Sequence, residues 1–381
     1  MKMRHLLLAL LLVFTMLLPG QAAFAQNNFA QNETKEYLVS FDGPSQKGLL
    51  KAFGVEEEDI IHEFNLLPVV QVELPENKAR GLKNHPHIKF VEENAEVTKL
   101  AQNVPWGIPR VQGTDAQNAG YTGNGVKVAI LDTGIDRSHP DLTANVQGGH
   151  SVFTDSANRD PFFDGDGHGT HVAGTVAAVN NDIGVVGVAS EADLYAVKVL
   201  NNAGSGSYAG IAEGIEWSIN NGMDIINMSL GGSQSSAILK EFSDLAYAEG
   251  LLVVAAAGNS GNRGGNNDTV GYPAKYESVI AVAATDQNNQ RATFSSTGPA
   301  VEISAPGAGI LSTTPNNNYA SFNGTSMASP HVAGVAAQVW QAKPHLSNVE
   351  LRNLLNDTAL PLGGSNQFGN GLVQSMAAIQ Q

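Results

Sequence analysis

Three residues of the chain carry the side chains that a serine nucleophile needs. Asp132 follows a short apolar run, His168 lies between two glycines, and Ser326 begins a predicted helix. A serine hydroxyl becomes a strong nucleophile only when an imidazole removes its proton, and a carboxylate must orient that imidazole and stabilise its charge. If the fold brings the three residues together, they could cleave an acyl bond such as a peptide bond.

Each of these residues also has an ordinary explanation. An Asp after a strand often closes a turn, a His is often a hydrogen-bonded structural residue, and a Ser before a helix often caps it. A second alternative uses His168 and His171 as the metal ligands of a metalloprotease, although the segment lacks the glutamate of a His-Glu-x-x-His motif. A third alternative is a non-enzymatic binding module on the same fold.

The elements that must position these side chains are predicted from apolar runs that alternate with helical segments. Short apolar runs bounded by turn residues are typical of strands buried on both faces. Their alternation with helices predicts an α/β fold in which a parallel sheet is flanked by helices, with ligands gathering at the carboxyl ends of the strands. The predicted strands are 126–131, 194–200, 225–230, 251–257 and 279–284, and the predicted helices are 169–180, 208–221, 237–249 and 326–341.

Three longer motifs surround the candidate residues. They are Ala-Ile-Leu-Asp-Thr-Gly-Ile at 129–135, His-Gly-Thr-His-Val-Ala-Gly at 168–174 and Gly-Thr-Ser-Met-Ala-Ser-Pro-His-Val-Ala-Gly at 324–334. Through them the chain resembles the subtilisin family of secreted serine proteases, over essentially residues 101–381. The resemblance implies that Asp132, His168 and Ser326 form a catalytic triad, in the chain order typical of subtilisins, within a subtilisin-like fold.

The resemblance also implies roles for residues outside the triad. Asn259, in Ala-Ala-Gly-Asn-Ser-Gly at 256–261, and the backbone N–H of Ser326 are expected to stabilise an oxyanion, whereas the motif alone would predict only a turn. Two glycine-containing segments are expected to hold the substrate backbone as an added strand, and two small residues to leave a pocket for a large apolar side chain before the cut. The expected substrate contacts are Gly204, Ser205, Gly206, Ser229, Leu230, Gly231, Ala256 and Gly258.

The first 25 residues have the features of a signal peptide. Two basic residues precede an apolar run at 6–18 that is too short to span a membrane, and a small-residue cleavage site ending at Ala25 follows it. We therefore predict that residues 1–25 are removed and that the protein is secreted into the extracellular space. An uncleaved membrane anchor is the alternative.

Residues 26–100 are predicted to form a small separate unit. They contain eight Lys and Arg and thirteen Asp and Glu, whereas the rest of the chain is sparsely charged. Their pattern predicts a β-α-β-β-α-β order, an α+β unit of the ferredoxin-like kind whose core is marginal without a disulfide or a metal. The resemblance implies that this unit is a propeptide, a folding helper and intramolecular inhibitor, which the catalytic domain (101–381) removes by cutting between Leu100 and Ala101. A purely structural N-terminal domain is the alternative.

The resemblance further implies one bound calcium ion, Ca2+. Its side-chain ligands are expected to be Gln102, Asp141 and Asn181, and its backbone oxygen ligands Val179, Ile183 and Val185. Alone, the Asn-Asn-Asp sequence at 180–182 would predict only a turn. A second, weaker cation site of the family has Asp where this chain has Glu302, so that site is left open.

Three acidic residues, Asp160, Asp164 and Asp166, crowd the segment before His168. We expect them to lie in a solvated loop rather than to form a further metal site. Their negative charges would raise the pKa of the imidazole.

The composition excludes several other classes of protein. The 381 residues include no cysteine, which rules out disulfides, thiolate zinc sites and cysteine nucleophiles. The net charge of -15 disfavours binding to nucleic acids or to anionic membranes. The expected partners are protein and peptide substrates and the propeptide, with no nucleic acid and no membrane, and we expect a monomer.

Overall fold

The computed structural model describes residues 34–95 and 102–381. The chain divides into two compact units, Met1–Lys99 and Leu100–Gln381, which are described separately. The predicted signal peptide (1–25) and the predicted cut after Leu100 lie outside the described residues. Within the described ranges, no helix is long and apolar enough to cross a membrane.

The first unit is a four-stranded antiparallel sheet with two helices on one face. Val39 of β1 is buried together with Leu50 of α1 and Leu82 of α2, so both helices cover the same side of the sheet. The strands lie in the order β2-β3-β1-β4. The elements are β1 (Thr34–Phe41), α1 (Lys47–Ala52), a 3-10 turn (Glu57–Asp59), β2 (Ile60–Glu63), β3 (Val69–Pro75), α2 (Glu76–Lys83) and β4 (Ile88–Glu93).

The second unit is built on a seven-stranded sheet in the order β11-β10-β9-β8-β5-β7-β6, in which every neighbouring pair is parallel. A separate antiparallel hairpin, β12–β13, precedes the longest helix. The strands are β5 (Lys127–Asp132), β6 (Val146–Ser151), β7 (Asp193–Lys198), β8 (Ile225–Met228), β9 (Leu252–Ala256), β10 (Ile280–Thr285), β11 (Val301–Pro306), β12 (Ile310–Thr314) and β13 (Asn318–Phe322).

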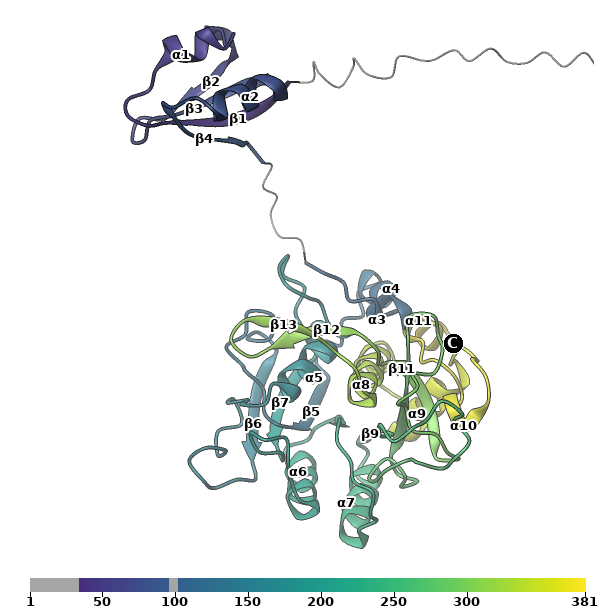
Figure 1. The fold of residues 1–381 in the computed structure, drawn as a ribbon. Coiled ribbons are helices and arrows are strands. Elements are labelled where there is room, and N and C mark those ends of the chain that lie inside the picture. Colours follow the sequence, from purple (N-terminus) through teal and green to yellow (C-terminus); the bar gives the residue numbers. More distant parts are fainter. Residues whose placement is uncertain (1–33, 96–101) are drawn as a thin grey trace, which may run out of the picture. The chain divides into compact units, whose positions relative to one another are not determined.

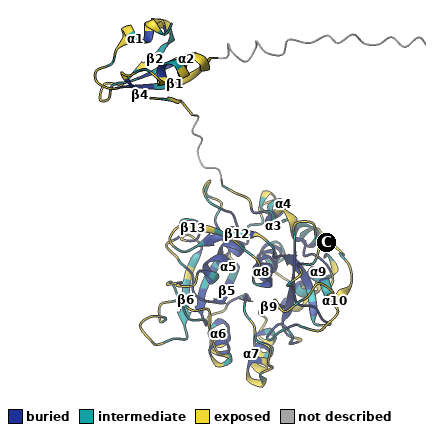
Figure 2. Ribbon diagram, viewed as in Figure 1, coloured by how far each residue is buried: buried dark blue, intermediate teal, exposed yellow. Residues whose placement is uncertain are grey.

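Helices cover both faces of this sheet (Figure 1). Val128 and Ile130 of β5 pack with residues of α5 and α8, whereas Ala129 and Leu131 pack with residues of α6 and α7. Figure 2 shows α5, α8 and β5 mostly dark blue, and exposed residues on α6 and α7. The helices are α3 (Gly107–Arg110), α4 (Gly113–Asn118), α5 (His168–Ala177), α6 (Tyr208–Asn220), α7 (Ala237–Ala248), α8 (Thr325–Ala342), α9 (Asn348–Asp357), α10 (Ser365–Phe368) and α11 (Ser375–Gln380).

The order of the strands reverses direction at β5. The chain proceeds from β5 to β6 and β7 on one side of it, and then to β8, β9, β10 and β11 on the other. Ligands of open parallel sheets bind at such a switch point, outside the carboxyl ends of the strands. Asp132, the last residue of β5, lies at this point.

The expected fold class and its central elements are confirmed. The five predicted strands correspond to β5, β7, β8, β9 and β10, and the four predicted helices to α5, α6, α7 and α8. The prediction missed the two edge strands, β6 and β11, the β12–β13 hairpin, the ten-residue helix α9 and the short helices. The residues of β6 are Val-Gln-Gly-Gly-His-Ser, which contain no apolar run because the strand is only half-buried at the edge.

Candidate active site

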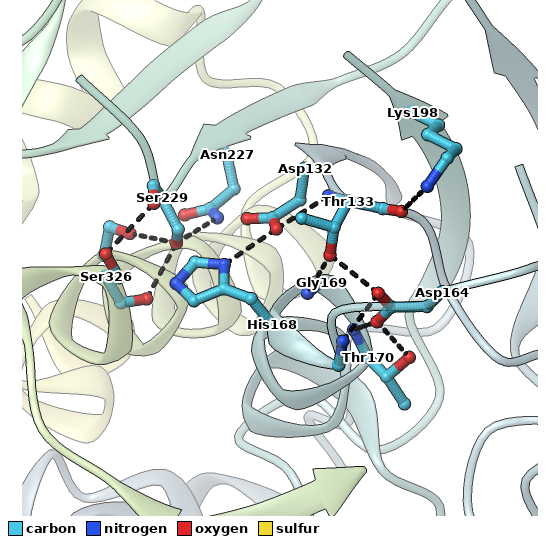
Figure 3. A network of polar contacts seen from close by, with 12 residues as sticks. Asp132, Thr133, Asp164, His168, Gly169, Thr170, Lys198, Asn227, Ser229 and Ser326 are labelled. Carbon is cyan, nitrogen blue, oxygen red and sulfur yellow. Dashed lines mark hydrogen bonds and ion pairs between the residues drawn. The ribbon is translucent and has the colours of Figure 1, made fainter. Parts of the chain in front are cut away.

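The imidazole of His168 directly contacts the carboxylate of Asp132. His168 is the first residue of α5, so the helix begins where β5 ends. The Nδ1 atom of His168 lies 2.7 Å from Oδ1 of Asp132, whose side chain is 1% exposed. A buried carboxylate at this distance accepts the Nδ1–H, which leaves Nε2 free to accept a proton. Figure 3 shows the ring lying between Asp132 and Ser326.

A second buried carboxylate, Asp164, holds the loops around this contact. Its Oδ1 accepts hydrogen bonds from the Thr133 hydroxyl and from the Gly167 N–H, each at 2.8 Å. Its Oδ2 accepts the N–H of Thr170 at 2.8 Å and the hydroxyl of Thr170 at 2.6 Å. Asp164 therefore satisfies free N–H groups at the start of α5, as a capping carboxylate does. The prediction of a solvated loop is wrong for this residue, which is 5% exposed.

The close approach of α5 to β5 depends on a glycine. A β-carbon on Gly169 would lie 2.1 Å from the carbonyl oxygen of Gly134 and 3.1 Å from Cβ of Asp132. The Gly169 N–H also donates to the Thr133 hydroxyl at 2.9 Å. Any larger residue at this position would push His168 away from its carboxylate.

Ser326 is fixed to the end of β8 by a reciprocal pair of hydrogen bonds. Its hydroxyl donates to the carbonyl oxygen of Ser229 at 3.0 Å, and the Ser229 hydroxyl donates to the carbonyl oxygen of Ser326 at 2.7 Å. That second acceptor is free because Pro330, four residues on in α8, has no N–H to donate. The Ser326 hydroxyl must therefore turn away from Ser229 before it can donate to His168.

The surroundings of His168 raise the pKa of its imidazole. Burial by itself would lower the pKa, but the charge and hydrogen bond of Asp132, with the charges of Asp166 and Asp164, raise it to about 9. Of the three acids expected to raise this pKa, Asp164 and Asp166 contribute, whereas Asp160 is not among its main causes. The neutral ring, which is the form that accepts a proton, therefore predominates only at alkaline pH.

The side chain of Asn259 is oriented by Thr325, the residue directly before Ser326. Its Oδ1 accepts the N–H of Thr325 at 2.9 Å and the hydroxyl of Thr325 at 3.1 Å, which directs Nδ2 the other way. A β-carbon on Gly324 would lie 3.5 Å from this Nδ2 and 3.5 Å from the backbone N of Ser326. Two donors thus flank one small region at the positive end of α8, where a negatively charged oxygen would be stabilised.

Two cavities lie on either side of the segment that follows β8. The first, of about 630 Å³, is lined by residues that include His168, Gly204, Gly206, Ser229, Leu230 and Gly231. The second, of about 540 Å³, is lined by residues that include Leu230, Gly231, Ala256, Gly258, Asn259 and Ser326. Seven of the eight expected substrate contacts therefore line a cavity. The exception is Ser205, which lines neither.

Comparison with known proteins assigns this arrangement to a family. The sequence profile of the subtilase family matches residues 123–371. The chain belongs to the subtilase family. It is 53% identical over 350 residues to alkaline elastase YaB of Bacillus sp. (strain YaB), which covers 92% of this chain and 89% of that protein.

Two further relatives cover most of the chain. M-protease of Shouchella clausii (strain KSM-K16) is 50% identical over 350 residues, 92% of this chain and 89% of that protein. Subtilisin E of Bacillus subtilis (strain 168) is 46% identical over 383 aligned positions, 98% of each chain. The resemblance found in the sequence is confirmed, and the chain is a serine peptidase of the subtilisin type.

His171, which the metalloprotease alternative required as a ligand, is a structural residue of the subtilase. Its Nε2 lies 2.9 Å from the carbonyl oxygen of Ile310 and 3.1 Å from that of Ala320, so this nitrogen carries the proton. The ring stacks on Phe322, with centroids 4.3 Å apart. Burial lowers the pKa of His171 to about 4, which keeps the ring neutral. The metalloprotease alternative is wrong.

Most of the expected calcium ligands gather around one amide. The Nε2 atom of Gln102 lies 2.7 Å from the carbonyl oxygen of Val179, 2.9 Å from that of Val185 and 3.3 Å from Oδ1 of Asn181. Asn181 in turn donates to Asp141 at 3.0 Å. We call these five residues the Gln102 cluster. The carbonyl of Ile183, the sixth expected ligand, has no contact that places it there, although its N–H donates to Asn181 at 3.2 Å.

The Gln102 cluster has the chemistry of a calcium site. Three oxygens converge on one nitrogen, and turning the Gln102 amide over would put a fourth oxygen in its place, an arrangement that only a cation would stabilise. The carboxylate of Asp141 is fully buried and forms no ion pair with a basic side chain among the described residues. The donors therefore fit calcium, which takes amide, carbonyl and carboxylate oxygens.

Glu302, at the position of the second cation site, is already paired. Arg352 donates to both of its carboxylate oxygens, and Asn356 donates to one of them at 2.8 Å. This bidentate contact leaves the carboxylate with its charge neutralised. The position therefore does not fit a cation.

Sequence reasoning missed the polar groups behind the triad. Lys198, at the end of β7, is fully buried and donates to the carbonyl oxygen of Thr133 (Figure 3). It also donates to the side chain of Asn202 at 2.9 Å. Burial lowers the pKa of Lys198. A signal for Asp164 was present, since Asp-Gly-Asp-Gly directly precedes a predicted helix, whereas no pattern in the sequence indicated Lys198.

Proposed function

We propose that this subtilase is a secreted, calcium-stabilised serine endopeptidase that cuts after large apolar residues and removes its own propeptide after Leu100. The observation that carries the proposal is the position of the His168 ring, paired with Asp132 on one side and facing Ser326 on the other (Figure 3). Family membership supports the reaction type.

In the first half of the reaction, Ser326 becomes acylated. Its hydroxyl turns from the Ser229 carbonyl to Nε2 of His168, which takes the proton as the oxygen attacks the peptide carbonyl carbon. Asp132 stabilises the imidazolium without accepting its proton. The developing oxyanion lies between Nδ2 of Asn259 and the N–H of Ser326. His168 then protonates the leaving amine, and the C–N bond breaks.

In the second half, a water molecule replaces the amine. His168 takes a proton from this water, the resulting hydroxide attacks the acyl carbon, and the same two donors stabilise the second oxyanion. The proton returns to Ser326 as the ester bond breaks. The products are two shorter peptides, and the enzyme is regenerated.

The preference for large apolar side chains rests on the second cavity. Leu230, Ala256 and Val270 give it aliphatic walls, and Gly258 leaves its space open. Leu100, the residue before the proposed self-processing cut, has a side chain of this kind. The first cavity, with Gly204 and Gly206, would take residues further from the cut.

Secretion and propeptide removal are proposed from the N-terminal sequence. Residues 1–25 have the charge, apolar run and small-residue exit of a signal peptide. The alignment with subtilisin E extends over 98% of this chain, and so includes residues from the segment before Ala101. We propose that residues 26–100 inhibit the enzyme until they are removed, and that the mature enzyme is a monomer.

Calcium would be held by the Gln102 cluster. Gln102, Asp141 and Asn181 would supply side-chain oxygens, and Val179 and Val185 backbone oxygens, with Ile183 joining after a local adjustment. Bound calcium supplies positive charge that neutralises Asp141 and the converging carbonyl dipoles. Its role is structural, because the cluster and His168 lie at opposite ends of α5.

A serine-directed phosphonate tests the proposal. The reagent should label Ser326 stoichiometrically and abolish peptide hydrolysis, and Ser326→Ala should prevent both hydrolysis and the cut after Leu100, which N-terminal sequencing of the secreted product detects. Hydrolysis by Ser326→Ala enzyme freed of contaminating protease would refute the mechanism. A protein that binds peptides without labelling or cleavage would be a binding module instead.

A further inference from the structure

The second cavity contains one ion pair. Nζ of Lys275 lies 2.6 Å from Oδ2 of Asp268, and both residues line the same cavity as Ser326 and Asn259. Among the lining residues, these two are the only ones with charged side chains. The side chains of Lys275 and Asp268 are 31% and 36% exposed. Both charges are therefore accessible from the cavity and only partly screened by water.

A bound substrate would direct one particular side chain into this cavity. When the acyl carbon is attached to Ser326 and its oxygen lies near Asn259, the side chain on the next carbon enters the space that these two residues line. That side chain belongs to the residue before the cut, called P1. A charge on P1 would therefore be in the same cavity as Asp268 and Lys275.

The position of Asp268 depends on a neighbouring glycine. Gly298 has a φ of +151°, and a β-carbon there would lie 2.4 Å from Oδ1 of Asp268. The Lys275 N–H donates to the carbonyl oxygen of Gly271, another residue lining the cavity, at 2.9 Å. Gly298 thus leaves room for the Asp268 carboxylate, and the backbone of Lys275 is fixed beside the cavity.

We propose that Asp268 determines the charge preference of this subtilase at P1, by neutralising Lys275. As long as the pair is intact, the cavity presents little net charge, which agrees with an apolar preference. Without Asp268, the three N–H donors of Lys275 would attract an acidic P1 side chain. Without Lys275, the carboxylate of Asp268 would attract a basic one. The inference rests on the proposed endopeptidase function.

The test compares peptides that differ only at P1. For the wild type and Asp268→Asn, kcat/KM is measured for P1 Glu and for P1 Gln, which has the same shape without the charge. At low salt, the Glu-to-Gln ratio of kcat/KM should rise about five- to tenfold in Asp268→Asn. This gain should be smaller in about 0.5 M NaCl, because screening by salt shortens the range of the charge. Because both values are measured on the same variant, a general loss of activity cancels in their ratio.

The partner variant should have the opposite effect. Lys275→Met should raise the ratio of P1 Lys to P1 Gln by a similar factor, and the double variant should return both ratios toward those of the wild type. Asp244→Asn is the matched control, because Asp244 pairs with Lys240 at the same 2.6 Å distance on α7, outside the cavity. This control should leave both ratios unchanged.

Three outcomes separate the possibilities. Unchanged ratios in both cavity variants, or the same change in Asp244→Asn, would overturn the inference while leaving the endopeptidase function intact. A rise in the Glu-to-Gln ratio for Asp268→Asn without the opposite effect of Lys275→Met would mean that the loop has rearranged, and would also overturn it. If the wild type hydrolyses none of the peptides, the proposed function itself fails.

Discussion

The two ends of helix α5 hold polar sites of opposite kinds. At the N-terminal end, backbone N–H groups of Gly167 and Thr170 are met by the carboxylate of Asp164. Beyond the C-terminal end, the carbonyl oxygens of Val179 and Val185 surround the amide of Gln102. The free N–H groups at the start of the helix favour an anion. The carbonyl oxygens of Val179 and Val185 lie in the loop beyond the helix and, as converging acceptors, favour a cation.

The two ends of α5 differ in whether the chain itself supplies the charged group that the site favours. At the catalytic end the anion is a side chain, so the geometry around His168 is complete without any ligand. At the Gln102 cluster no basic side chain provides the cation among the described residues, and an amide donor occupies the central position. The catalytic end should therefore be insensitive to chelators in its chemistry, whereas the stability of the other end should depend on calcium.

The largest effect is expected from replacing the anion at the catalytic end. Asp164→Asn would put an NH2 group against at least one of four donors, so we expect a loss of about 3 kcal/mol in unfolding free energy and a matching loss of activity at temperatures where the wild type is stable. Denaturant unfolding of the phosphonate-inhibited enzyme measures the change. Asp166→Asn, an exposed acid two residues on, is the control and should cost less than about 0.5 kcal/mol. Equal effects would contradict the capping role.

The next effect concerns the charge of His168. With its pKa raised to about 9, kcat/KM should fall about tenfold per pH unit below that value, to about a hundredth of its plateau at pH 7. Because the folded pKa exceeds the unfolded one, the stability from the charged His168–Asp132 pair is complete below the unfolded pKa and is lost as pH rises through about 9. Activity and this part of the stability should therefore vary in opposite directions.

A pH–rate profile of the wild type and Asp166→Asn checks this. Since the charge of Asp166 helps to raise the pKa of His168, its removal should move the acid limb to lower pH. A wild-type limb centred near the unperturbed histidine value, or no movement in the variant, would show that the acids around the ring do not control its protonation.

These residues also show how far the sequence alone could lead. The strands β5, β8 and β9 were predicted because they are buried on both faces and therefore consist of apolar runs. The triad was predicted because its motifs are long and lie at strand and helix ends. The role of Asp164 was not predicted, because its donors Thr133 and Thr170 come from separate segments of the chain. They surround this carboxylate only after folding. The Asp268–Lys275 pair was missed for a related reason, since nothing in the sequence shows that both face one cavity.

Removing calcium should destabilise the fold through the Gln102 cluster and leave the chemistry at His168 unchanged. If calcium is present at about a hundred times its Kd, chelation should lower the unfolding free energy by about 2.7 kcal/mol, with a lower Tm and slow loss of activity. Asp141→Asn should abolish this dependence, whereas Glu302→Gln, at the carboxylate already bound by Arg352, should retain it. Immediate, complete loss of activity on chelation, reversed by zinc, would instead place a metal in the chemistry.

The smallest effect is expected from a hydroxyl at the edge of the Gln102 cluster. Burial and the neighbouring carboxylate of Asp141 raise the pKa of Tyr319 to about 12, so the hydroxyl beside this carboxylate keeps its proton at all ordinary pH values. Tyr319→Phe should cost about 1 kcal/mol of unfolding free energy, and more in chelator than in saturating calcium, because the cation and the hydroxyl both stabilise the charge of Asp141. Tyr276→Phe removes a hydroxyl that donates to a backbone carbonyl at 2.8 Å, and its cost should not depend on calcium. A calcium-independent cost for Tyr319→Phe would mean that Asp141 does not bind the ion.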